Sequence, residues 1–134
     1  MSALDRSAFL REAKALFPEL RADLNSQYGL LHLEMHAFCD FVQKLVDGRD
    51  EKRVLQAFQF ADHIGRSGNG DVVNALVVSF LEHLNLEDGK AQRSWAKGLM
   101  PPDLAREFAV AQTYHSKLPA SGQPNKSLER TRGR

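Results

Sequence analysis

The sequence predicts an all-α fold: a compact bundle of five or six helices around one apolar central helix, followed by a disordered tail. Apolar residues recur at three- and four-residue spacing through most of the chain up to residue 116. No segment shows the two-residue alternation that is typical of a half-buried strand. At Lys117 the composition changes to turn-forming and basic residues. We therefore expect a helical domain over residues 1–116 and a disordered basic tail over residues 117–134.

The first two helical segments have well-marked apolar faces and ends. The first covers about residues 5–27, with Asp5 as a candidate N-cap. Pro18 falls inside it and should kink the helix or begin a second short one, because proline lacks an amide donor. The second segment covers about residues 31–47, and Gly48 ends it. Its apolar stripe consists of Leu31, Met35, Phe38, Val42 and Leu45.

The later segments include the most apolar helix of the chain. A third helix begins at Asp50, a natural N-cap, and ends before the glycine-rich turn at residues 67–70. The next helix, about residues 72–84, has few polar residues, so neighbours should cover most of its circumference, and we take it as the central helix. A short helix over residues 89–97 and a last one over residues 101–114 complete the predicted bundle.

Composition and charge exclude several classes of protein. With 43% apolar and 26% charged residues, the 134-residue chain is typical of a globular domain with one core. The part up to residue 116 carries a net charge of −3 and the rest +4, so the body offers no electrostatic footprint for specific nucleic-acid binding. The longest apolar run, residues 75–78, is far below the roughly 20 residues that cross a bilayer. We expect no membrane partner.

The N-terminus and the cysteine content favour a cytoplasmic protein. The first residues lack the basic segment and apolar run of a signal peptide. Cys39 is the only cysteine, which rules out an internal disulfide and fits a reducing compartment. It would be a nucleophile only if a histidine lowered its pKa, and its place at the border of the apolar arc favours a packing role.

Two histidines are the sharpest chemical candidates. His32 and His36 are spaced i,i+4, share a helix face and can chelate a divalent metal, and Asp40 extends the row. The zinc-protease helix requires a glutamate directly after the first histidine, and here Glu34 lies on a different side. Further ligands would have to come from elsewhere, with His63 as a candidate. The alternative interpretation is a pair of solvated histidines.

No motif predicts catalysis or a cofactor. The turn at residues 67–70 lacks the Lys-Ser/Thr that follows a phosphate-binding loop, so we interpret it as an interhelical turn with Asp71 as the next N-cap. The following helix, residues 72–84, is neither basic nor polar, which excludes a helix-turn-helix reader. The basic tail allows at most non-specific contact with nucleic acid, and a solvated extension is the simpler interpretation.

Acidic residues gather on or beside the second and third predicted helices. They are Asp40, Asp47, Asp50, Glu51 and Asp62. An acidic surface suits a basic protein partner through electrostatic steering, and we take Asp40, Asp47 and Glu51 as the candidate partner-binding residues. The alternative is a merely soluble helix face. The chain is expected to be a monomer or a homodimer, and exposed parts of aromatic side chains would form the dimer interface: Phe41, Phe60 or Trp95.

Two segments resemble known sequences. Residues 16–21 (LFPELR) and 71–84 (DVVNALVVSFLEHL) resemble a family of short, uncharacterised, all-helical bacterial proteins over roughly residues 10–115. Their size and helical style are similar to immunity proteins of bacterial toxin systems, and the resemblance implies no catalytic residue. Residues 123–134 resemble the read-through of a frame into the recombination site of an integron gene cassette, which implies an accessory gene on a mobile element.

The sequence therefore favours a non-enzymatic protein-binding module without a cofactor. The resemblances add an immunity- or antitoxin-like role carried on a gene cassette. The alternative function is a metal- or small-ligand-binding helical protein that uses His32 and His36.

Overall fold

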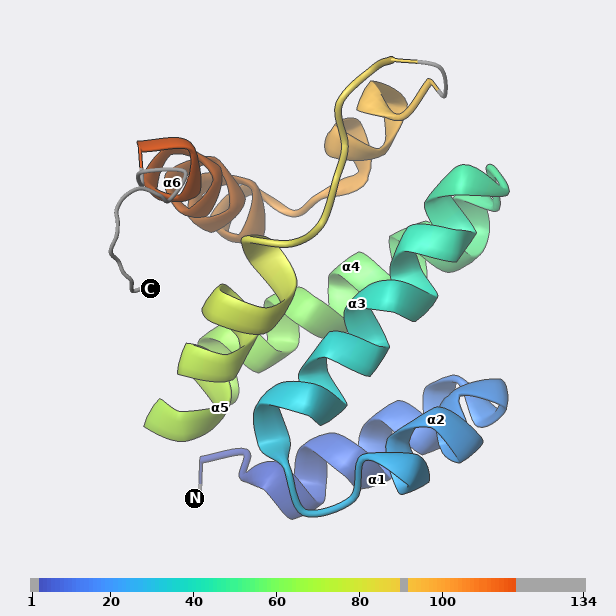
Figure 1. Ribbon diagram of the computed structural model, residues 1–134, viewed down its shortest axis with the longest axis vertical. Coiled ribbons are helices and arrows are strands. Elements are labelled where there is room, and N and C mark those ends of the chain that lie inside the picture. The colour runs from blue at the N-terminus through green and yellow to red at the C-terminus, as the bar shows by residue number, and fades with distance from the viewer. Residues whose placement is uncertain (1–2, 90–91, 118–134) are drawn as a thin grey trace, which may run out of the picture.

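The computed structural model describes residues 3–89 and 92–117, and within these ranges the chain is helical without named strands (Figure 1). This confirms the predicted all-α class. The expected tail begins inside the last helix at Lys117, and its residues 118–134 lie outside the described part. The elements are α1 (Arg6–Leu16), η1 (Pro18–Leu20), α2 (Arg21–Ser26), α3 (Leu31–Asp47), α4 (Glu51–Ser67), α5 (Gly70–Leu76), η2 (Val77–Leu81), η3 (Ser94–Leu99) and α6 (Pro102–Lys117).

Three helix starts follow the signals predicted from the sequence. The Asp5 carboxylate accepts a hydrogen bond from the Ala8 amide at 2.9 Å and caps α1. Pro18 begins the 3₁₀ helix η1, so the chain turns there, as proline requires. Asp50 caps α4 by accepting from the Arg53 amide at 3.3 Å.

No helix in the described ranges is long and apolar enough to span a bilayer.

The turn between α4 and α5 differs from the prediction by its capping residue. Asn69, rather than Asp71, is the N-cap of α5, because its extended backbone brings its side-chain oxygen to 2.9 Å from the Val72 amide. Gly68 precedes it in a tight position, where a Cβ atom would lie 2.6 Å from the Ile64 carbonyl oxygen. The Leu4 amide donates to the Ser67 carbonyl and the Asn69 amide donates to the Leu4 carbonyl, so this turn is paired with the N-terminal segment.

The prediction of one regular α-helix over residues 72–84 is wrong. Its α-helical part ends at Leu76, and residues Val77–Leu81 form a π-helix, η2, in which the Glu82 amide donates to the Val77 carbonyl at 3.0 Å. The wider turn keeps the same side chains buried, among them Phe80 and Leu81. η2 packs against α3 and α6, so the segment still lies at the centre of the bundle.

The short helix predicted over residues 89–97 begins later than expected. The Asp88 carboxylate accepts hydrogen bonds from the Arg93 and Ser94 amides at 2.8 and 2.9 Å and from the Ser94 hydroxyl at 2.7 Å. These bonds satisfy the first amides of a 3₁₀ helix, η3, that runs to Leu99. The same hydrogen bonds lower the pKa of the Asp88 carboxyl.

Helix α3 runs through the middle of the molecule, with α1 and α2 along one side and α5 on the other (Figure 1). The ring of Phe38, on α3, is fully buried among four other aromatic rings. Its centroid lies 6.3 Å from Phe9, 6.3 Å from Phe17, 5.6 Å from Phe60 and 5.0 Å from Phe80. The four rings come from α1, the α1–η1 junction, α4 and η2, so one side chain joins most of the bundle.

A buried ion pair joins α1 to the start of α3. The Arg6 guanidinium donates from Nε and Nη2 to the two carboxylate oxygens of Glu34, at 2.8 and 2.7 Å, and Glu34 is fully buried. The Gly29 amide, at a positive φ of 96°, donates to the same carboxylate at 3.0 Å. The Arg6 guanidinium also lies 4.7 Å from the centre of the Tyr28 ring. Its hydrogen bonds to Glu34 raise the pKa of Arg6.

Replacing the central ring should destabilise the whole domain. Phe38→Ala removes a fully buried ring and leaves a cavity between four neighbouring rings, so the free energy of unfolding should fall by about 3–5 kcal/mol. Urea denaturation followed by circular dichroism measures this loss. The control is Val110→Ala, at a side chain that is 64% exposed, and its effect should stay below about 0.5 kcal/mol.

The two halves of the ion pair should respond unequally to truncation. Arg6→Ala leaves a fully buried carboxylate without its cation and should cost about 3–5 kcal/mol. Glu34→Ala should cost less, because the Arg6 side chain is 29% exposed and its charge can return to water. Urea denaturation of both single variants and of the double variant measures the difference. Equal or reversed losses would contradict a buried role for the Glu34 charge.

Candidate functional site

The structure gives His32 and His36 different neighbours. His32 is exposed, and its Nδ1 lies 2.9 Å from the hydroxyl of Ser79 on η2. His36 lies with its Nδ1 3.5 Å from the Asp40 carboxylate, and its ring packs edge-on against His83 with centroids 5.4 Å apart. His63, the candidate third ligand, lies on α4, where its Nε2 is 3.2 Å from the Glu12 carboxylate.

No metal-ligand set is assembled in the part of the chain that the structure describes. Within it, no group of three or more histidine, cysteine, aspartate or glutamate side chains is placed to hold a metal ion. The contact of His63 with Glu12, on α1, accounts for its position without a metal. A metal bound by His32 and His36 therefore stays a prediction, and no further described ligand supports it.

The candidate acidic residues lie in different environments. Arg93 donates to both Asp47 oxygens, at 2.7 and 3.4 Å, and these bonds lower the pKa of Asp47. Glu51 is exposed in the first turn of α4, where a negative charge is favourable. Asp62 was expected on the surface but is buried, 9% exposed, and lies 3.0 Å from the Arg66 guanidinium. Asp40 is 63% exposed and lines a groove between two helices.

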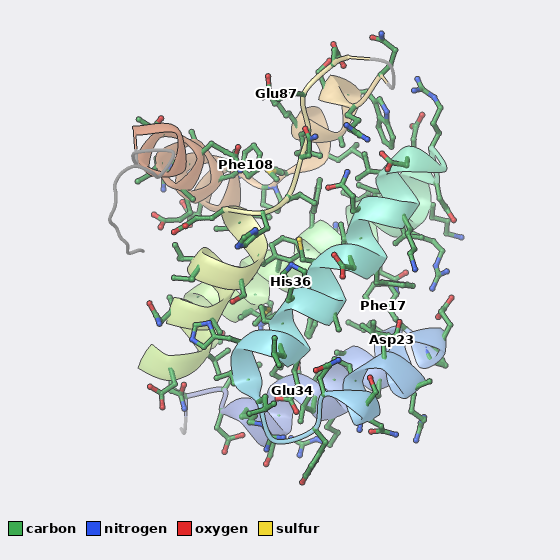
Figure 2. The ribbon with its side chains drawn as sticks, in the orientation of Figure 1. Phe17, Asp23, Glu34, His36, Glu87 and Phe108 are labelled. Carbon is green, nitrogen blue, oxygen red and sulfur yellow. The ribbon has the colours of Figure 1, made fainter. Side chains whose placement is uncertain are left out.

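That groove lies between α2 and α3 and has a volume of about 270 Å³. Asp23 contributes a carboxylate from α2, while Asp40 and Lys44 contribute charged groups from α3. Leu33 and Ala37 form its apolar part. Figure 2 shows Asp23 and His36 on these neighbouring helices.

Three large apolar side chains are exposed close together in the sequence, and one of them, Leu33, also lines the groove. Tyr28 is 68% exposed, Leu30 56% and Leu33 47%. They lie on the α2–α3 connection and the first turn of α3, and we call them the Tyr28–Leu33 patch. Periodicity gave a usable sign of this patch, since Leu30 and Leu33 fall outside the apolar stripe of α3. The aromatic residues expected at a dimer interface are less exposed than these three side chains.

Of those aromatic residues, Phe60 is wrong as a surface candidate. It is 4% exposed and packs against the rings of Phe9 and Phe38. Phe41 and Trp95 are half-buried against the core. The Trp95 indole N–H donates to the Gln92 carbonyl at 3.0 Å, so its polar edge is already satisfied.

A second hollow, of about 260 Å³, lies where α4, α5, η2 and α6 meet. Its floor is aliphatic and its edge is charged. The aliphatic residues are Val73, Leu76, Val77, Leu81 and Leu104, and the charged ones are Asp62, Arg66, Asp103, Arg106 and Glu107. Asp103 and Arg106 form an ion pair with each other.

Cys39 has no catalytic geometry. Its side chain is 3% exposed, and its sulfur lies 3.6 Å from the Phe80 carbonyl oxygen, to which the thiol donates. Burial raises the pKa of the Cys39 thiol to about 12, so it stays protonated at neutral pH. The interpretation of Cys39 as a core side chain fits these contacts.

The Cys39 thiol should therefore resist alkylation in the folded protein. At pH 8 iodoacetamide should leave the native chain unmodified over a time in which the chain unfolded in urea reacts completely, because the reactive thiolate is absent and access is closed. Intact-mass spectrometry counts the added carbamidomethyl groups. Rapid labelling of the native chain would contradict the raised pKa and the burial.

Comparison with known proteins identifies a family but no described function. Neither a curated protein nor a solved structure matches the chain. Residues 10–115 match a family described as a domain of unknown function, DUF7674. The match spans α1 from Leu10 onward and reaches into α6, so it includes the α2–α3 groove, the second hollow and the Tyr28–Leu33 patch. The chain belongs to this family of domains of unknown function.

Proposed function

We propose that this chain is a non-enzymatic protein-binding module that binds a basic partner protein on the face formed by the Tyr28–Leu33 patch and the α2–α3 groove. The observation that carries the proposal is the exposure of Tyr28, Leu30 and Leu33 within six residues. Several exposed large apolar side chains within one short segment favour a protein interface, whereas single exposed ones are common anywhere on a surface.

Charge favours a basic partner for this face. Asp23 and Asp40 line the groove from its two sides, and Asp40 is 63% exposed. Lys44 is the opposing charge in the groove, so the carboxylates outnumber the ammonium group. A partner segment with an apolar side chain flanked by lysine or arginine would bury the patch and meet these carboxylates.

The backbone under the patch is held in place before any partner binds. The Gly29 amide donates to Glu34, and the Arg6 guanidinium covers one face of the Tyr28 ring. A surface that is already ordered loses less conformational entropy on binding. This fixed geometry supports a binding role for the connection rather than that of a passive linker.

The biological setting we favour is that of an immunity- or antitoxin-like protein on a mobile gene cassette. Small helical proteins with an acidic body suit the neutralisation of a basic toxin, because opposite charges speed association. In this setting the chain acts by occupying its partner and needs no catalytic group. A metal-binding role of His32 and His36 has less support, since these residues contact Ser79 and Asp40 respectively.

Truncation within the patch should weaken partner binding without loss of folding. Affinity capture from the lysate of the source organism, with the full chain as bait, would recover the partner, and biolayer interferometry would measure its affinity. Leu33→Ala should weaken binding by about 2 kcal/mol, roughly 30-fold, and Asp40→Asn should slow association at low salt.

The matched control is Val110→Ala on α6, which should leave the affinity unchanged. Circular dichroism melting of each variant separates lost binding from lost folding. Equal binding by Leu33→Ala and the native chain would place the interface elsewhere. A native dimer that Leu33→Ala dissociates would make a second copy, rather than a basic partner, the occupant of this face.

A further inference from the structure

The second hollow contains a buried charge with little compensation. Asp62 is 9% exposed, and among the described residues its carboxylate Oδ2 lies 3.0 Å from the Arg66 Nε. The Arg66 side chain is itself 64% exposed and follows Asp62 by one helical turn. A carboxylate removed from water is costly unless it is paired and hydrogen-bonded, and a solvated arginine is a weak partner.

The walls around Asp62 are aliphatic and fixed by the fold. Val77 and Leu81 line the hollow from η2, where the π-helical turn widens the backbone, and Leu104 lines it from α6. Gly65, next to Arg66 on α4, also lines the hollow and adds no side chain to it. π-Helical turns occur often at functional sites.

These features together define the chemistry of a ligand. An aliphatic floor favours a hydrocarbon chain, and a buried carboxylate at its edge favours a cation. Glu107 adds negative charge to the edge, while the charges of Asp103 and Arg106 are paired with each other. The volume of about 260 Å³ is small, so it suits a stem of a few carbon atoms.

We infer that this hollow is a binding site for an organic cation with a short aliphatic stem, whose ammonium or guanidinium group displaces Arg66 and pairs with Asp62. A free alkylamine and a lysine side chain share this chemistry. The site is formed by other elements than the Tyr28–Leu33 patch, so it does not depend on the proposed docking face.

Titration with small probes tests the inference directly. Pentylammonium added to the full, ¹⁵N-labelled chain should shift the amide resonances of Gly65, Leu76 and Val77 in a saturable way. 1-Pentanol supplies the stem without the charge, and methylammonium supplies the charge without the stem. Both should bind at least about tenfold more weakly than pentylammonium. Equal binding of pentanol or methylammonium would overturn the inference.

Two substitutions with opposite expected effects separate a ligand site from a structural role of Asp62. Asp62→Asn keeps the side-chain shape and should weaken pentylammonium binding about tenfold or more. Arg66→Gln removes the internal competitor and should tighten binding several-fold, which a merely structural ion pair would not do. The control Asp40→Asn removes an equal charge from an exposed residue outside the hollow and should change binding less than twofold.

The two sources of the cation are distinguished by a second probe. If the physiological ligand is a protein side chain, N-acetyl-lysine N-methylamide should bind at least as tightly as pentylammonium, and a free amine is favoured if it binds more weakly. Should Asp62→Asn fail to fold, the Arg66→Gln titration decides alone. Weaker binding by Arg66→Gln than by the native chain would overturn the inference.

Discussion

The packing of Phe38 is the constraint on which the rest of this structure depends. Its ring contacts rings from α1, the α1–η1 junction, α4 and η2, and it is fully buried. Close packing lets such a ring adopt one arrangement, because a shift large enough to relieve one contact breaks another. The positions of α1, α4 and η2 relative to α3 follow from this arrangement. The α2–α3 groove and the orientation of η2 are consequences of the same core.

The Glu34–Arg6 pair adds specificity where the aromatic core ends. Hydrophobic packing alone would allow the first turn of α3 to rotate, whereas a buried carboxylate with three donors has one satisfactory position. Burying this charge does not make the pair a source of large net stability, since desolvation offsets much of the attraction. Its effect is directional: with Glu34 inside, Leu30 and Leu33 on the neighbouring positions remain outside. The exposed patch is thus coupled to a buried ion pair.

Periodicity and capping residues predicted most of the elements but little of the site. The cap at Asp5, the turn at Pro18 and the helix over residues 31–47 depend on local chemistry, which a sequence displays. The burial of Glu34 depends on Arg6, 28 residues away, and no local pattern reports such a contact. η2 was missed because a π-turn keeps the apolar spacing of an α-helix over so short a stretch. Phe60 and Asp62 were placed on the surface because a helix buried on more than one side has no single apolar stripe.

Two features of the domain are unfavourable for folding, and this is the strongest physical reason to interpret them as functional. The exposed side chains of Tyr28, Leu30 and Leu33 and the buried carboxylate of Asp62 all lie outside the hydrophobic core that packs α3 and η2. Both features cost free energy, the first by exposing apolar surface and the second by desolvating a charge. Sequences whose local choices otherwise agree with the fold tend to break these rules at binding sites. Leu16 and Leu55, exposed singly at 38% each, break no such rule, because isolated apolar side chains are ordinary on any surface.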